Sequence, residues 1–165
     1  MRKEKIEKNL AHAFSEESKM GSRYGAFVLK AEQEGYPQLA RFFRAVANAK
    51  SVHARRFLYL LRGKIGTTQE NLKLALEGEV AAGETLLGMI EEAKGASKAV
   101  KKAFIQSNKT DGEYARLLDE ARRDMLTGTE TVYYVCQICG HIHKNDVPEN
   151  CPVCKAVSGR FKKLL

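Results

Sequence analysis

The four cysteines of this chain all lie in its last fifth, and their spacing constrains the fold more than any other feature. They form Cys136-Gln-Ile-Cys139, then eleven residues, then Cys151-Pro-Val-Cys154. A Cys-x-x-Cys turn presents two thiolates to one point, so two such turns predict a tetrahedral four-sulfur metal site that holds iron or zinc. Iron makes such a site a one-electron carrier, whereas zinc makes it structural. Two disulfides are the alternative, which the spacing and the absence of any sign of secretion disfavour.

Length and charge set the broad class. The 165 residues suffice for one domain and a small module, and no apolar run is long enough to span a membrane. The charged start, Met1-Arg-Lys-Glu-Lys, has no apolar stretch behind it, so we expect a cytoplasmic protein without membrane contact. The net charge of +8 is scattered and no nucleic-acid-reading motif accompanies it, so we expect no nucleic-acid partner. An acidic redox partner protein fits the positive field.

The chain before the cysteines is helical in pattern, from about residue 5 to residue 126. Breaks are predicted at Gly35-Tyr36-Pro37, in the loop 65–71 and at Gly95, which gives four helices arranged as two hairpins. Residues 126–131 are polar and predict a linker, and 132–135 predict a short strand that leads to the first cysteine pair. We therefore predict a four-helix bundle over residues 1–128 and a small four-cysteine domain over residues 129–165.

The two hairpins are weak copies of each other. Glu17 lies eight residues after Asn9, and Glu79 lies eight residues after Asn71. In the second helix of each hairpin, Lys50 and His53-Ala54-Arg55 recur 61 residues later as Asp111 and Tyr114-Ala115-Arg116. A duplicated hairpin predicts a bundle with pseudo-two-fold symmetry, in which equivalent residues face one another across the centre.

Such bundles often hold a dinuclear metal site at their centre. Two helices each supply a Glu, and the other two each supply a Glu-x-x-His, because residues three apart share one helical face. The positions of this pattern are taken here by one His, one Tyr, one Lys and three acids. They are Glu17, Lys50, His53, Glu79, Asp111 and Tyr114.

At this level the chain resembles the rubrerythrins over nearly its whole length. The stretches that carry the resemblance are 22–27, 30–36, 65–73, Glu77-Gly-Glu79, and the tail from Tyr134 to Cys154 with Phe161. The resemblance implies a mainly α, ferritin-like four-helix bundle followed by a rubredoxin-like domain with iron in the four-cysteine site. It also implies a peroxide reductase of oxygen-sensitive microbes, in which electrons pass from the tail iron to a di-iron centre. Members are usually dimers, often with the tail of one chain near the bundle of another, so we expect a homodimer or a higher homo-oligomer.

The chain departs from the family pattern at the bundle centre. The first Glu-x-x-His is Lys50-Ser-Val-His53, the second is Asp111-Gly-Glu-Tyr114, and Ala82 stands where the family has a further Glu. A gapped alignment of the fourth helix would place Ser107 and Thr110 at the second motif, but the internal repeat favours the ungapped register.

The charges at this centre argue against a full di-iron site. Three acids would carry three negative charges in a poorly solvated core, where unpaired charge is costly or forces protonation. The Lys50 ammonium supplies one positive charge and repels cations, so we expect it to pair with Glu17, Glu79 or Asp111. A protonated His53 with one neutral carboxyl could balance the rest, and so could one divalent metal held by His53, Glu79 and Asp111, with or without Glu17.

Single residues leave further alternatives open. His53 is either a satisfied core histidine or a metal ligand, and Lys50 is a salt-bridge partner or a base. Tyr114 could donate a hydrogen bond to a carboxylate, ligate ferric iron or carry a radical. His141 and His143 follow the first cysteine pair in alternation, and we expect both to be solvated.

Three functions follow from these readings. The first is one-electron transfer through the four-thiolate iron, with the bundle site altered or lost. The second is a peroxide reductase or oxidase that works at an atypical one- or two-metal bundle centre. The third is a non-redox binding protein with structural zinc in the tail.

Overall fold

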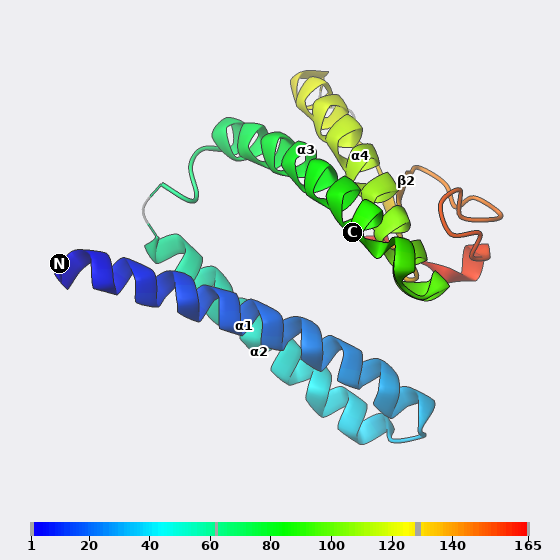
Figure 1. The fold of residues 1–165 in the computed structure, drawn as a ribbon, viewed down its shortest axis with the longest axis horizontal. Helices are drawn as coiled ribbons and strands as arrows, with labels where there is room; N and C mark the ends of the chain where they lie inside the picture. The colour runs from blue at the N-terminus through cyan, green and yellow to red at the C-terminus, as the bar shows by residue number, and fades with distance from the viewer. Residues whose placement is uncertain (1, 62, 128–129, 165) are drawn as a thin grey trace. The chain divides into compact units, whose positions relative to one another are not determined.

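The computed structural model describes residues 2–61, 63–127 and 130–164. These residues form two compact units, Met1–Thr67 and Thr68–Leu165. The predicted class is confirmed, because four long helices precede a small three-stranded sheet that bears the cysteines (Figure 1). The predicted domain boundary at residues 128–129 lies outside the described residues. No helix in the described part of the chain is long and apolar enough to cross a membrane.

The first unit is an antiparallel hairpin of α1 (Arg2–Gln33) and α2 (Pro37–Leu60), which run side by side in Figure 1. The predicted break lies where expected. Gly35 has φ of +79°, which glycine adopts without steric cost, and Pro37 occupies the first turn of α2, where its missing N–H costs nothing. Near this turn Val28 and Ala40 are buried, and Phe43 packs against them.

The second unit begins with another helical hairpin. Helix α3 (Thr68–Glu92) runs into a 3-10 turn, η1 (Ala93–Gly95), and α4 (Lys98–Thr127) returns along it. The break predicted at Gly95 is therefore present. Helix α4 continues through Leu126 and Thr127, two residues into the segment predicted as linker.

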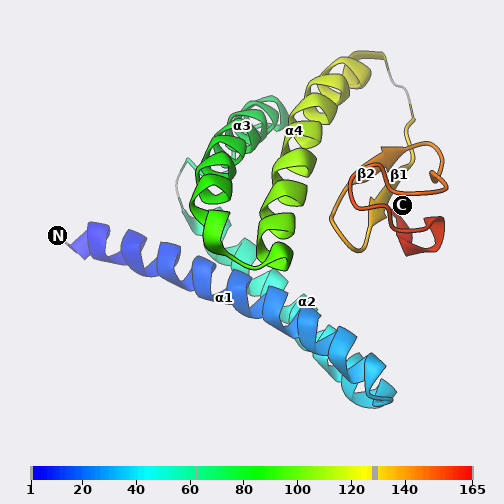
Figure 2. The same ribbon diagram turned by 45° about the vertical axis from the view of Figure 1, so that its right-hand side comes forward.

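The tail completes the second unit with a three-stranded antiparallel sheet. Its strands are β1 (Tyr133–Cys136), β2 (Ile142–Lys144) and β3 (Phe161–Leu164), in the order β2-β1-β3, with a short η2 (Ser158–Arg160) before β3. Figure 2 shows this sheet beside α4. Because β1 is the central strand and ends at Cys136, the sheet fixes the first cysteine pair at the end of that strand.

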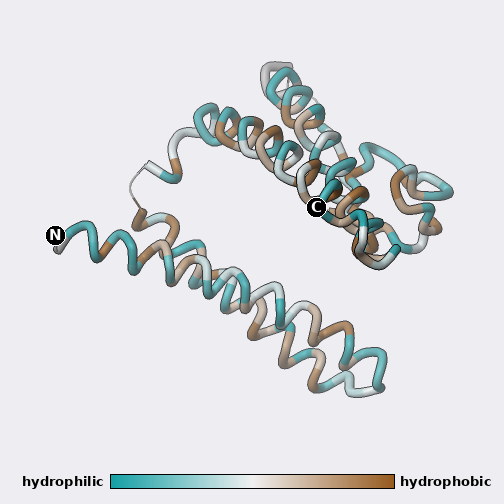
Figure 3. The backbone as a smooth tube through the Cα atoms, in the orientation of Figure 1, coloured by the Kyte–Doolittle hydropathy of each residue, from teal (hydrophilic) through white to brown (hydrophobic). Residues whose placement is uncertain are grey.

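Hydrophobic and hydrophilic residues are interspersed along every helix (Figure 3). Several large apolar residues stay exposed, among them Leu29, Phe42, Val80 and Leu87. A two-helix hairpin is a single layer, and a single layer cannot bury apolar residues on both of its sides. Each hairpin therefore presents an apolar face of the kind that a four-helix bundle covers.

Candidate metal centre and its contacts

The four cysteine sulfurs converge on one point. The Sγ atoms of Cys136 and Cys154 are 3.6 Å apart, as are those of Cys139 and Cys151. Four ligands about 2.3 Å from a central metal, at the corners of a tetrahedron, would be about 3.8 Å apart. A disulfide needs about 2.05 Å, and all four thiols are free. The cysteines are thus positioned to bind a metal. Among the described residues, no other group of three or more His, Cys, Asp or Glu side chains has its ligand atoms close enough together to hold one.

The two cysteine turns have matching backbone geometry. The N–H of Gly140 donates to the carbonyl of Cys136 at 2.9 Å, and the N–H of Lys155 donates to the carbonyl of Cys151 at 2.9 Å. Both closing residues have left-handed φ values, +83° at Gly140 and +65° at Lys155. The sequence thus makes two equivalent turns, each of which aims two sulfurs at the same point.

Backbone amides point at the sulfurs. Burial disfavours the thiolate of Cys136, but hydrogen bonds from the N–H groups of Ile138 and Cys139 and from neighbouring cysteine side chains together lower its pKa. Burial raises the pKa of Cys139, and the N–H of His141, which donates to its sulfur, opposes that effect. Amides that donate to sulfur favour the charged thiolate that a metal requires.

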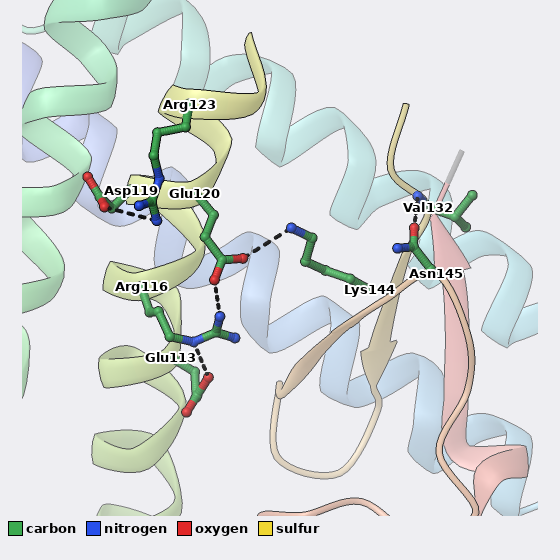
Figure 4. A network of polar contacts seen from close by, with 8 residues as sticks. All are labelled: Glu113, Arg116, Asp119, Glu120, Arg123, Val132, Lys144 and Asn145. Carbon is green, nitrogen blue, oxygen red and sulfur yellow. Dashed lines mark hydrogen bonds and ion pairs between the residues drawn. The ribbon is translucent and has the colours of Figure 1, made fainter. Parts of the chain in front are cut away.

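The tail packs on α4 of its own chain. Lys144 Nζ lies 3.1 Å from Glu120 Oε2, and the same carboxylate accepts from Arg116, whose guanidinium also contacts Glu113. Figure 4 shows this network between α4 and the tail. The Asn145 side chain holds the start of β1 through the N–H of Val132 at 3.4 Å. Charged contacts thus fix the sheet to the helix.

An apolar groove of about 480 Å³ lies between the helices α3 and α4 on one side and the sheet on the other. Glu79, Tyr114 and Leu117 line it from the helices, and the sheet contributes residues from each of its strands, including Val135, Ile142 and Leu164. Glu79 and Tyr114 therefore belong to the wall that faces the cysteine domain.

Tyr114 makes the most direct contact between α4 and a cysteine turn. Its Oη donates to the carbonyl oxygen of Gly140 at 2.6 Å. A carboxylate is thus not the acceptor of its hydrogen bond, which corrects that expectation, because the packing of the sheet on α4 brings a backbone carbonyl to the phenol. Burial raises the pKa of Tyr114, and the nearby charge of Asp111 adds to this effect.

Two acids of the predicted bundle centre lie together in the second unit. Burial raises the pKa of Glu79, and the charge of Asp111 raises it further. Burial also raises the pKa of Asp111. Neither carboxylate makes an ion pair among the residues that the structure describes. The pair is therefore an uncompensated acidic spot beside Tyr114.

The other three predicted residues lie together in the first unit. Lys50 Nζ is 2.9 Å from Glu17 Oε1, and His53 Nδ1 is 3.1 Å from Glu17 Oε2. The hydrogen bond from Lys50 is the main reason that the pKa of Glu17 is lowered. The predicted pairing of Lys50 with a carboxylate is present, with Glu17 as its partner. Each hairpin thus holds one half of the predicted set, with a cation in the first and two acids in the second.

One expectation about the tail is wrong. His141 is buried, 6% exposed, and neither of its ring nitrogens has a hydrogen-bond partner among the described residues. Its strand alternation suggested solvent exposure, but the ring meets His143 edge-on and lies near the charges of Glu113 and Arg116 on α4. Burial accordingly lowers the pKa of His141. His143 is half-buried and contacts Asp146 at 3.1 Å.

Sequence reasoning also missed the partners of Tyr114 and Lys144. A glycine directly after Cys139 indicates a left-handed turn residue, so the need for glycine at position 140 could have been found. Its role as acceptor for Tyr114 could not, because no sequence pattern reports which helix packs on the sheet. The Glu120–Lys144 pair joins residues 24 apart and leaves no periodic mark.

Comparisons with known proteins agree with this geometry. The Rubrerythrin family model matches residues 8–69, and the model described as "Rubrerythrin, rubredoxin-like domain" matches residues 134–162. A rubrerythrin of Porphyromonas gingivalis is 31% identical, with 97% of this chain and 90% of that protein aligned. Nigerythrin of Nitratidesulfovibrio vulgaris is 29% identical, over 88% of this chain and 80% of that protein.

A solved structure supports the same assignment. Nigerythrin in its mixed-valence state aligns with a TM-score of 0.56 and 25% identity, over 96% of this chain and 86% of that chain. With 31% identity to a rubrerythrin over nearly the whole chain, four helices, and a small sheet that bears four converged cysteines, the chain belongs to the rubrerythrin family of non-haem iron proteins.

Proposed function

We propose that the four-cysteine site binds one iron and carries one electron at a time. The observation that carries this proposal is the convergence of four thiols, all within 4.8 Å of one another and two pairs of them 3.6 Å apart, with amide donors around them. Thiolates of this number and arrangement suit iron as well as zinc. The similarity to nigerythrin, which is described in a mixed-valence state, supports iron. When bound, the iron supplies reversible exchange between its ferrous and ferric states.

The residues around the site have defined tasks in this proposal. Cys136, Cys139, Cys151 and Cys154 hold the metal, and the backbone amides of the turns stabilise their negative charge. Ile138 lies in the first cysteine turn and is 58% exposed. That turn is therefore at the protein surface, where a redox partner protein can approach the metal. The positive net charge of the chain favours a partner with an acidic surface.

The bundle site is altered in this proposal and holds no full di-iron centre. A Lys50 ammonium 2.9 Å from Glu17 occupies a carboxylate that a metal would need. It replaces a bridging carboxylate of the family pattern, and it cannot ligate a metal while it is protonated. Electron transfer through the tail then remains as the main activity.

A second candidate is a peroxide reductase that works at an atypical bundle centre. The uncompensated pair of Glu79 and Asp111 favours it, because two carboxylates with raised pKa values gain from a bound cation. Peroxide reduction to water needs two electrons and the tail iron carries one. The tail would therefore have to deliver electrons twice for each turnover.

Metal analysis of anaerobically purified full-length protein, joined to a visible spectrum, separates these functions. One iron per chain and a red ferric–thiolate spectrum support electron transfer through the tail. Further iron, together with peroxide-dependent reoxidation of the reduced tail, supports the second candidate, and a colourless protein with one zinc refutes both. Cys139→Ser should abolish the tail metal. The matched control Ile138→Ser, one residue earlier in the same turn, should keep it.

We also propose that the chain assembles as a homodimer or higher homo-oligomer in the cytoplasm. The apolar faces of its two hairpins, which include Phe42 and Leu87, support association. Sedimentation equilibrium of the iron-loaded protein tests the proposal, and a monomer at micromolar concentration would contradict it.

A further inference from the structure

The peptide group between Gly140 and His141 is hydrogen-bonded at both of its ends. Its carbonyl oxygen accepts from the Tyr114 hydroxyl at 2.6 Å. Its N–H, which belongs to His141, donates to the sulfur of Cys139. A phenol on α4 and a cysteine sulfur at the metal site are therefore joined through a single peptide.

The backbone holds this peptide in place. The carbonyl of His141 accepts from the N–H of Cys136 at 2.9 Å, and the N–H of Gly140 donates to the carbonyl of Cys136 at 2.9 Å. Gly140 also makes room for the phenol, since a Cβ built on it would lie 2.9 Å from Tyr114 Oη. The close approach of the hydroxyl thus depends on the glycine.

The helix that carries the phenol is fixed to the same domain. Glu120, six residues after Tyr114 on α4, holds Lys144 of β2 at 3.1 Å. Leu117 on α4 and Ile142 on β2 line the groove between the two elements. The phenol and the peptide therefore meet within one packed unit rather than at the end of a mobile side chain.

A peptide transmits polarisation between its two ends. Its C–N bond has partial double-bond character, so a hydrogen bond accepted by the oxygen makes the N–H a stronger donor. Hydrogen bonds to the sulfurs are among the factors that set the potential of an iron–thiolate centre. Reduction adds one negative charge to the metal–thiolate group, so a stronger donor stabilises the reduced form more than the oxidised form.

We propose that Tyr114 is a positioning residue that tunes the metal centre from α4. Its hydroxyl polarises the Gly140–His141 peptide, strengthens the bond from the His141 N–H to the Cys139 sulfur, and so raises the reduction potential of the tail iron. The effect on potential rests on the proposed function, because it requires iron in the tail, whereas the hydrogen-bonded relay does not. At the place where the family pattern has a histidine ligand, this chain thus has a residue that serves the other metal site.

Potentiometry of the iron-loaded full chain tests the effect on potential. Tyr114→Phe keeps the ring and removes the hydroxyl, so the reduced form should lose about threefold in its equilibrium with the oxidised form, which is about 28 mV at 59 mV per tenfold for one electron. Tyr59→Phe is the matched control, because that hydroxyl belongs to α2 and its residue is 70% exposed. A potential in Tyr114→Phe equal to that of Tyr59→Phe would overturn the proposal.

A second variant changes the bond in the opposite direction and guards against misfolding. 3-Fluorotyrosine at position 114 keeps the shape of the side chain but makes the phenol a stronger donor, so the potential should rise. A merely structural role for Tyr114 predicts no rise. If Tyr114→Phe fails to fold or to bind iron, the fluorinated chain decides alone, and an unchanged potential in it refutes the proposal.

The relay itself is tested without iron. In the zinc-loaded full chain, which is diamagnetic, the amide proton of His141 should move upfield in Tyr114→Phe as its bond to sulfur weakens, while the amide of Ala156 in the second turn stays in place. Equal shifts at both amides, or at neither, would overturn the relay. A chain that takes up no iron would sink the proposed function, and the His141 amide would still decide the relay.

Discussion

Replacing Gly140 by alanine tests how closely the tail fits α4. The residue has φ of +83°, where an alanine costs about 1–2 kcal/mol more than a glycine. The new Cβ would also lie 2.9 Å from Tyr114 Oη, so the phenol must withdraw from the carbonyl. Loss of that hydrogen bond adds about 1 kcal/mol. We therefore expect Gly140→Ala to destabilise the second unit by about 2–3 kcal/mol.

A double-mutant cycle separates the two contributions. In a Tyr114→Phe background the oxygen is absent and no hydrogen bond remains to be lost, so Gly140→Ala should cost about 1–2 kcal/mol and the coupling should be about 1 kcal/mol. Gly35→Ala supplies the conformational cost alone. Gly35 has φ of +79°, and no atom lies within 4 Å of its built Cβ.

Guanidinium unfolding of the zinc-loaded full chain measures these energies. The Gly140 variants are followed through tail amides and the Gly35 variant through α1 amides, because a chain of two units does not unfold as a single transition. Equal costs for Gly140→Ala and Gly35→Ala would refute the reasoning. Additive costs in the cycle would refute it as well, because they would place the phenol outside contact with the glycine.

Two further predictions concern the halves of the predicted bundle site. Lys50→Met should raise the pKa of Glu17 toward its ordinary value of 4.5, since the ammonium hydrogen bond is the main cause of its lowering, and carboxyl NMR checks this. The control Lys19→Met removes a lysine of α1 that pairs with Glu16, and it should leave the pKa of Glu17 unchanged. Glu79 and Asp111 have raised pKa values, so these two carboxyls stabilise the second unit while they are protonated, and that contribution should be lost as pH rises through those values. Glu79→Gln should flatten this dependence in urea unfolding measured from pH 4 upward, and an unchanged slope would contradict it.

The sequence predicted the elements of this fold well because their signals are local. Pro37 and Gly95 mark helix ends through their own backbone preferences, and the cysteine spacing fixes two turns of known shape. The pairing of Lys50 with a carboxylate joins residues 33 apart, and it was predicted from the charges at the bundle centre, which left three acids as possible partners.

What could not be predicted depends on packing between distant segments. His141 follows the strand alternation of an exposed residue, yet it is buried in the packed tail, near Glu113 and Arg116 of α4. Tyr114 was predicted at the bundle centre, whereas the acceptor of its hydroxyl belongs to a turn 26 residues later. Non-local contacts of this kind follow from how a domain sits on a helix, which residue patterns along one element do not encode.

The contact between Tyr114 and Gly140 also bears on how the two halves of the duplication diverged. His53 and Tyr114 occupy equivalent positions of the predicted repeat, and the cysteine domain packs on the helix that carries Tyr114. His53 contacts a carboxylate of its own hairpin, while Tyr114 contacts the tail. A change at position 114 is therefore constrained by the residue at position 140, and a change at position 53 is not. Among relatives that keep the tail on the second hairpin, the side chain at the first of these places and the glycine at the second should be gained and lost together.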